Sequence, residues 1–173
     1  MPSLQQLADS GADLEADYVV VGGGTAGLAF ADALASASDA TIVLIDRRPA
    51  PGGHWVEGYP FLRLHHSSYY YGVDSLPLGA GGRMPAGRDR GQEERASGAE
   101  VCAYFQRVLD EKLLATGRVA WLPRSEWSAD GTVRSLDGGA TRRVHARRKV
   151  VDATYTNSRV PATDPPPLMN SRR

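Results

Sequence analysis

The chain lacks the features that mark several classes of protein. It contains a single cysteine, Cys102, so no disulfide can form within the chain. No apolar run approaches the roughly 20 residues that a membrane-spanning helix needs. The N-terminus has no basic segment before an apolar core, as a secretory signal would. We therefore expect a cytoplasmic protein with no disulfide framework and no membrane as a partner.

An excess of charge of either sign is also missing. Twenty basic and twenty acidic residues give a net charge of zero, so the electrostatic footprint of a nucleic-acid-binding protein is not evident. The exception is a basic cluster in a strand-like segment, made of Arg142, Arg143, Arg147, Arg148 and Lys149. We interpret it as a solvated strand face, because a phosphate-binding tail is normally a longer basic block. No set of histidines or cysteines has the spacing of metal ligands, so we expect no metal site.

The most informative segment that is present joins an apolar run to a glycine-rich turn. Residues 18–21 read as a short strand, residues 22–27 follow the pattern Gly-x-Gly-x-x-Gly, and residues 28–34 continue with a helical pattern. A second apolar run over residues 41–45 ends in Asp46. Strand, glycine turn, helix, strand and terminal acid in this order are typical of a dinucleotide-binding βαβ unit. The alternative is a glycine-rich turn in an α/β protein that binds no ligand.

A physical reason explains each glycine of the motif. Gly22 permits the tight exit from the strand, Gly24 lets a pyrophosphate approach the backbone, and Gly27 allows the helix to pack closely on the sheet. The start of the helix, at Thr25 and Ala26, offers free N–H groups and the positive end of the helix dipole to phosphates. These residues are our predicted phosphate contacts.

The segment that begins at Asp46 bears on the kind of dinucleotide. Asp46 can accept hydrogen bonds from a ribose diol and would repel a 2′-phosphate, so NADP fits this site poorly. A basic residue, Arg47, follows, and Gly52-Gly53-His54-Trp55 comes shortly after. In this acid and Gly-Gly-x-Trp pattern the chain resembles the two-dinucleotide-binding-domain flavoproteins, and among them the flavin-containing and Baeyer–Villiger-type monooxygenases.

That resemblance implies FAD as the cofactor and assigns contacts to it. Gly52 and Gly53 would let the backbone approach FAD, Trp55 would lie near the flavin, and Arg47 would lie over the adenosine end. His54 would sit beside the flavin and is the best histidine for proton transfer, but the sequence assigns no catalytic residue. The predicted cofactor contacts are Gly22, Gly24, Thr25, Ala26, Gly27, Asp46, Arg47, Gly52, Gly53, His54 and Trp55.

The remaining segments predict the rest of an α/β fold. Ser97-Gly98-Ala99-Glu100 reads as a capping box that opens a helix to about Ala115, and Gly117 is placed to end it. A strand follows over residues 118–122. Turn signals at Asp130-Gly131 and Asp137-Gly138-Gly139 then predict a small antiparallel meander through residues 125–150. The expected fold is a Rossmann-like FAD-binding domain, a parallel sheet with helices into which the meander is inserted.

The expected organisation has three parts. Residues 1–16 form an N-terminal extension, residues 17–156 the FAD-binding domain, and residues 157–173 a disordered tail. Within the domain, the long segment 47–95 has little periodicity and would wrap the flavin. The segment ending in Ala153-Thr154-Tyr155 resembles a family turn that ends in Ala-Thr-Gly, so Ala153 and Thr154 are either FAD contacts or a plain strand end.

Two functions of different classes remain open. The resemblance implies an FAD-dependent, monooxygenase-like oxidoreductase with NAD(P)H as co-substrate of the full-length family. The NAD(P)H site, a second glycine motif, is not present in this chain, so we expect a truncated N-terminal part. The alternative is a non-catalytic remnant that binds a nucleotide weakly or not at all, and a weaker third reading is an NAD-binding regulatory domain. The substrate and the oligomeric state stay open.

Overall fold

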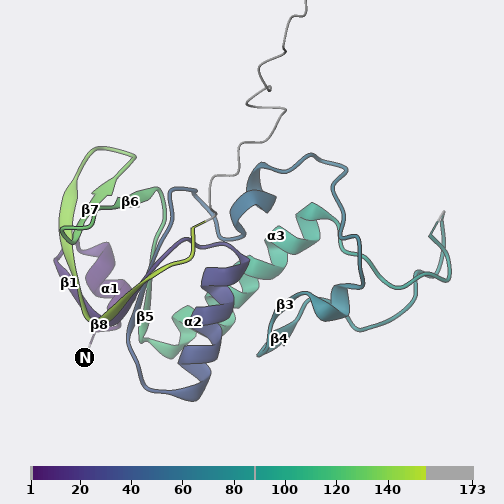
Figure 1. Ribbon diagram of the computed structural model, residues 1–173, viewed down its shortest axis with the longest axis horizontal. Helices are drawn as coiled ribbons and strands as arrows, with labels where there is room; N and C mark the ends of the chain where they lie inside the picture. The colour runs from purple at the N-terminus through teal and green to yellow at the C-terminus, as the bar shows by residue number, and fades with distance from the viewer. Residues whose placement is uncertain (1, 88, 155–173) are drawn as a thin grey trace, which may run out of the picture.

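The computed structural model describes residues 2–87 and 89–154, which form three layers around one mixed sheet (Figure 1). The sheet has six strands in the order β5-β2-β1-β8-β7-β6. They are β1 (Leu14–Val21), β2 (Ile42–Ile45), β5 (Val119–Leu122), β6 (Ser125–Trp127), β7 (Thr132–Ser135) and β8 (Thr141–Asp152). Strands β5, β2, β1 and most of β8 run parallel, whereas β8, β7 and β6 pair antiparallel. The predicted α/β, Rossmann-like fold is confirmed.

Helices cover both faces of the parallel strands. Helix α2 (Thr25–Ala37) and helix α3 (Gly98–Arg107) lie on one face, and α1 (Leu4–Asp9) lies on the other (Figure 1). Alternate strand residues divide between two cores: Val20 and Leu44 face α2 and α3, whereas Val19 and Val43 face the side of α1. Because both faces are buried there, β2 and residues 18–21 of β1 read as continuous apolar runs rather than alternating ones.

Helix α3 begins and ends where the sequence predicts. The Ser97 side chain accepts from the Glu100 backbone N–H and the Glu100 side chain accepts from the Ser97 backbone N–H, which completes the capping box. The helix continues through a wider turn (Val108–Leu113) and a tighter one (Leu114–Thr116). It stops at Gly117, whose φ of 71° is left-handed and favours glycine.

Residues 2–16 contain helix α1 and the start of β1. Leu4 and Ala8 of α1 are buried against the sheet, and β1 begins at Leu14, before the boundary expected at residue 17. The Gln5 carboxamide accepts a hydrogen bond from the Trp121 backbone N–H at 2.7 Å, on the edge strand β5. The first helix therefore covers an edge that would otherwise be open to another strand.

Strand β8 serves both the meander and the parallel sheet. Its first residues pair with β7, and from Val144 onward it pairs with β1. The register with β1 shifts in the middle, so that Asp17 of β1 lies opposite both Arg147 and Arg148. The meander that the sequence predicts is present, but it is continuous with the main sheet.

The long segment between β2 and α3 contains short elements: two 3₁₀ turns, Gly53–Glu57 and Ser68–Tyr70, and a two-stranded sheet, β3 (Gly72–Val73) and β4 (Leu76–Pro77). Side chains of the helices hold this small sheet. The Tyr104 hydroxyl accepts from the Val73 N–H at 2.7 Å and donates to the Leu76 carbonyl at 2.6 Å. From α2, Asp32 accepts the Ser75 N–H at 3.1 Å.

The sequence predicts neither a membrane-spanning helix nor a metal site, and the described residues bear on both predictions. Within residues 2–87 and 89–154, no helix is long and apolar enough to cross a membrane. The same residues contain no group of three or more histidine, cysteine, aspartate or glutamate side chains that could hold a metal ion. The tail expected over residues 157–173 lies outside the described residues.

Candidate nucleotide-binding site

The glycine turn lies at the carboxyl ends of β1 and β2, where open α/β sheets bind ligands. Gly22 has a φ of 110° and donates its N–H to the Ile45 carbonyl at 2.8 Å. A Cβ on Gly22 would lie 2.8 Å from the Ala153 carbonyl oxygen, and a Cβ on Gly27 would lie 1.9 Å from the Gly22 carbonyl oxygen. Both positions thus need glycine for the fold itself.

Gly24 is different, because the fold alone does not require a glycine there. Its φ is −82°, and the nearest atom to an added Cβ would be the Gly53 Cα at 3.5 Å, an ordinary contact. Gly24 is the N-cap of α2, and no side chain caps the helix. Among the described residues, the backbone N–H groups from Gly24 to Gly27 have no hydrogen-bond acceptor. The start of α2 therefore presents unpaired donors and the positive end of its dipole.

The Gly-Gly motif predicted to contact FAD lies directly against this turn. Gly52 donates its N–H to the Gly23 carbonyl at 2.9 Å, and both Gly52 and Gly53 have positive φ, 123° and 60°. A Cβ on Gly53 would lie 2.9 Å from the Gly24 Cα. Two motifs that are separate in the sequence are thus brought into backbone contact.

Asp46 closes the same end of the sheet. Its carboxylate accepts the Gly23 N–H at 2.5 Å and the Arg48 N–H at 2.7 Å, and only 7% of the residue is exposed. Each oxygen thus accepts one bond and retains the capacity to accept another, as a ribose diol requires. Beside it, Arg48 Nε is buried without a partner in the described part of the chain.

Two predicted contacts, Arg47 and His54, have exposed side chains. The Arg47 side chain is 74% exposed, and its Nε lies 3.8 Å from Glu126 of β6. His54 is exposed at the surface next to Trp55, with the two ring centroids 5.2 Å apart. The structure therefore groups the glycines, Thr25 and Asp46, and leaves Arg47 and His54 at the rim.

Two aromatic residues at the site were not among the predicted contacts. The Trp55 indole N–H donates to the Tyr71 hydroxyl at 2.6 Å, and that hydroxyl lies 2.7 Å from Thr25 Oγ1. A Cβ on Gly23 would lie 2.5 Å from the Trp121 ring, which supports the turn from β5. No spacing rule connects Tyr71 or Trp121 to the glycine motif.

The strand end at Ala153 and the lone cysteine, Cys102, both pack against glycines of the two motifs. Ala153 donates its N–H to the Val21 carbonyl at 2.8 Å and lies against Gly22, while Thr154 bonds to the Asp152 carboxylate. Cys102 lies on α3 beneath Gly52, and burial raises the pKa of its thiol. A raised pKa disfavours the thiolate that redox chemistry requires.

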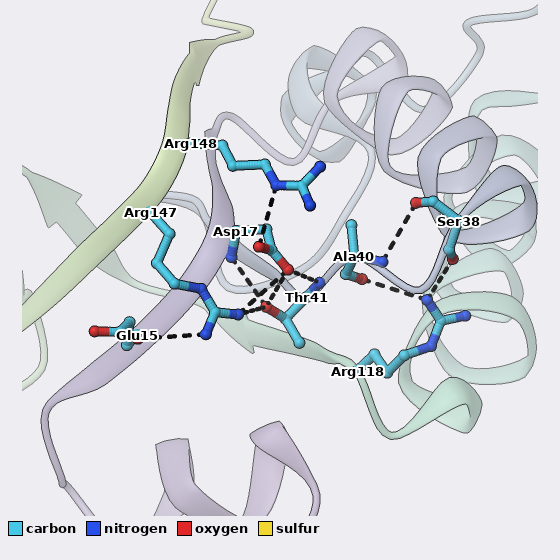
Figure 2. Close-up of polar contacts among 8 residues, drawn as sticks. All are labelled: Glu15, Asp17, Ser38, Ala40, Thr41, Arg118, Arg147 and Arg148. Atoms are coloured by element: carbon cyan, nitrogen blue, oxygen red, sulfur yellow. Dashed lines mark hydrogen bonds and ion pairs between the residues drawn. The ribbon is translucent and has the colours of Figure 1, made fainter.

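A second polar cluster lies at the opposite end of the sheet (Figure 2). Asp17, with a side chain only 15% exposed, pairs with Arg147 and Arg148 at 3.3 Å each. Its carboxylate also accepts the Thr41 N–H at 2.9 Å and the Thr41 hydroxyl at 3.0 Å. The pKa of this carboxyl is lowered chiefly by the Thr41 backbone N–H, with further contributions from the Thr41 hydroxyl and the Arg147 charge. The solvated basic face predicted for β8 is thus partly used in ion pairs.

Near this cluster, Arg118 caps the carboxyl end of α2 (Figure 2). Its guanidinium donates to the carbonyls of Ser38 at 2.6 Å, Ala35 at 3.1 Å and Ala40 at 3.3 Å. A cation at this end of a helix satisfies carbonyls that lack partners and complements the helix dipole. These contacts stabilise the carboxyl end of α2 and the neighbouring strand ends.

Comparisons with known proteins find matches to part of the chain and to part of longer proteins. Residues 20–67 match the family described as NAD(P)-binding Rossmann-like domain. The uncharacterized protein Rv2000 of Mycobacterium tuberculosis is 47% identical over 154 residues, which cover 89% of this chain and 28% of that protein. The uncharacterized protein Mb2023 of Mycobacterium bovis matches equally. The chain thus spans less than a third of the length of these relatives.

Solved structures agree on the fold. A flavin-containing monooxygenase from Stenotrophomonas maltophilia matches with a TM-score of 0.55 and 23% identity over 84% of this chain and 42% of that chain. Cyclohexanone monooxygenase from Rhodococcus sp. Phi1, bound to NADP+, matches with a TM-score of 0.55 and 22% identity over 82% of this chain and 26% of that chain. The chain therefore shares the fold of part of these monooxygenases, and the resemblance stated from sequence is confirmed at the level of the fold.

Proposed function

We propose that this chain is the FAD-binding part of an FAD-dependent, monooxygenase-like oxidoreductase that uses NAD(P)H. The observation that supports it most is the contact between the two glycine motifs. Gly24 and Gly53 meet beside the unpaired N–H groups of α2, and Asp46 lies at the neighbouring strand end. Backbone donors, a space without side chains and a carboxylate at one sheet edge suit the diphosphate and ribose of a dinucleotide.

The residues of the site fit FAD, and each would contact a different part of the cofactor. The N–H groups at Gly24, Thr25 and Ala26 would donate to the diphosphate, and Asp46 would accept from the adenosine ribose. Gly53 lets the second motif approach the turn closely, because a Cβ there would lie 2.9 Å from the Gly24 Cα. When bound, FAD supplies the electron transfer, whereas the protein binds, orients and tunes it. The chain's contribution is therefore binding and orientation.

NAD is the competing ligand, because the matched family is described as NAD(P)-binding. FAD and NAD share an adenosine diphosphate half, and the contacts above all belong to that half. The placement of Gly52-Gly53 against the turn favours FAD, since the flavoprotein resemblance assigns this pair to it. An NAD-binding regulatory domain would instead prefer NAD over FAD in direct competition.

The test is a titration of the purified 173-residue chain with FAD, ADP and NAD by isothermal calorimetry. Gly24→Ala should fold normally, since its Cβ makes an ordinary contact, yet lower the affinity for ADP and FAD at least about tenfold by filling the phosphate cradle. Gly138→Ala is the matched control, because a Cβ there meets nothing within 4 Å.

Three outcomes separate the readings. Wild-type binding that Gly24→Ala weakens and Gly138→Ala leaves unchanged supports the site. Equal binding by Gly24→Ala and wild type, or no binding of any of the three ligands by wild type, contradicts it. Bound FAD that NADPH reduces would establish catalysis by this chain, whereas FAD that stays oxidised would assign the chain to binding alone.

A further inference from the structure

Three side chains from distant parts of the sequence form a single line of hydrogen bonds that ends at the glycine turn. Trp55 Nε1 lies 2.6 Å from the Tyr71 hydroxyl, and the Tyr71 hydroxyl lies 2.7 Å from Thr25 Oγ1. Trp55 follows the Gly-Gly motif, Tyr71 follows the 3₁₀ turn at residues 68–70, and Thr25 is the first residue of α2. Trp55 is 9% exposed, so its indole N–H depends on Tyr71 for its partner.

The chemistry of the three groups gives this line a direction. An indole N–H can only donate, so the Tyr71 oxygen accepts from Trp55. The single Tyr71 proton then has Thr25 Oγ1 as the acceptor that the described residues offer. If Thr25 donated instead, the Tyr71 proton would have no acceptor in this part of the chain. When Tyr71 donates to Thr25, the Trp55 N–H and the Tyr71 hydroxyl proton each have an acceptor. The Thr25 hydroxyl proton is then left without one among the described residues.

We propose that Trp55 and Tyr71 orient Thr25 so that its hydroxyl donates to a phosphate of the bound dinucleotide. Thr25 lies beside the unpaired N–H groups of Gly24 and Ala26, where the diphosphate is expected. Its oxygen accepts from Tyr71, and its proton is therefore free to point toward an anion. This inference rests on the proposed function and adds a side-chain donor to a site otherwise built of backbone.

Tyr71 and Trp55 are positioning residues in this arrangement, since they act through Thr25. The indole N–H of Trp55 is committed to Tyr71 and does not itself contact the phosphate. Tyr71 also touches Phe105 of α3, with ring centroids 6.1 Å apart. Its ring is thus held by packing, and Tyr71→Phe removes the hydroxyl while it retains the ring.

The experiment measures the affinity of the full 173-residue chain for ADP by calorimetry. Thr25→Val should weaken ADP binding at least about tenfold, because it removes a hydrogen bond to a charged acceptor. Tyr71→Phe should weaken it about three- to tenfold, because it removes the neutral hydrogen bond that orients Thr25. Thr25→Ser, which keeps the hydroxyl, should bind within about twofold of wild type. Tyr69→Phe is the matched control, because Tyr69 is 61% exposed, and it should bind as wild type.

A double mutant distinguishes positioning from general support. If Tyr71 acts through Thr25, Tyr71→Phe should change the affinity less than about twofold when Thr25 is already valine. The thermal unfolding of each variant is measured to check that the fold is retained. Additive losses in the double mutant, or unchanged ADP binding by Tyr71→Phe, would overturn the inference while leaving the proposed function standing. A wild-type chain without ADP binding would overturn both.

Discussion

The two ends of helix α2 differ in the hydrogen-bond partners of their backbone groups. At the carboxyl end, Arg118 bonds to the carbonyls of Ser38, Ala35 and Ala40, and Asp17 lies nearby between two arginines (Figure 2). At the amino end, the N–H groups from Gly24 to Gly27 have no acceptor among the described residues. Folded proteins pair most of their polar groups, and donors left unpaired at a helix start are where an anion binds. The difference separates an end that stabilises the fold from the end at which we propose that a ligand binds.

The largest expected effect tests whether glycine at the amino end serves the fold or the ligand. Gly27→Ala would place a Cβ 1.9 Å from the Gly22 carbonyl oxygen, so the helix must move from the sheet. We expect the free energy of unfolding to fall by on the order of 3 kcal/mol, measured by urea denaturation. Gly24→Ala should lose less than about 1 kcal/mol while losing ligand affinity. Equal destabilisation by both variants would remove the distinction between the two glycines.

A smaller effect is expected at the carboxyl end. Asp17→Asn removes the charge between Arg147 and Arg148 and should lower the free energy of unfolding by on the order of 1–2 kcal/mol, with nucleotide affinity unchanged. Asp39→Asn is the control, because Asp39 is exposed at the same end of the sheet. A change in ADP affinity for Asp17→Asn would show that the two ends are coupled.

The same variant has a pH signature. The pKa of Asp17 is lowered in the folded chain, so the folded state binds fewer protons there than the unfolded state. Its stabilisation is therefore present above the ordinary value of 3.8 and is lost as the pH falls through the lower folded pKa. The stability difference between wild type and Asp17→Asn should be largest near neutral pH and shrink toward pH 3. A difference that does not change with pH would contradict this.

The smallest expected effects concern ligand affinity and compare two adjacent residues. Asp46→Asn should weaken ADP binding about five- to tenfold, since a neutral amide is a poorer acceptor for a ribose diol. Arg47→Gln should change it less than about threefold, because this side chain is 74% exposed and lies toward Glu126. A larger loss for Arg47→Gln than for Asp46→Asn would reverse the assignment of the ribose site.

Much of the fold follows from local rules that the sequence displays. The apolar runs of β1 and β2, the capping box at Ser97 and the left-handed Gly117 all depend on neighbours within a few positions. The glycine turn was predictable from the spacing of its glycines between an apolar strand and a helical pattern. The approach of Gly53 to Gly24 agrees with the flavoprotein resemblance, which assigned both to one cofactor.

The remainder depends on contacts between distant segments. Half of the residues of strand β8 are charged, so its periodicity alone did not show that it would cross from the meander to the parallel sheet. The opposition of Asp17 to two arginines follows from a register shift that no local pattern encodes. The line from Trp55 through Tyr71 to Thr25 joins three segments whose proximity only the packed fold establishes.

The most direct test compares the two ends of α2 in one experiment. The ¹⁵N–¹H correlation spectrum of the 173-residue chain would be recorded while ADP is added. We predict large shifts for the amides of Gly24, Thr25 and Ala26 and for those of Gly52 and Gly53, with the amide of Thr41 unchanged. Shifts centred on Thr41, or no shift at the glycine turn at saturating ADP, would contradict the assignment of the amino end of α2 as the nucleotide site.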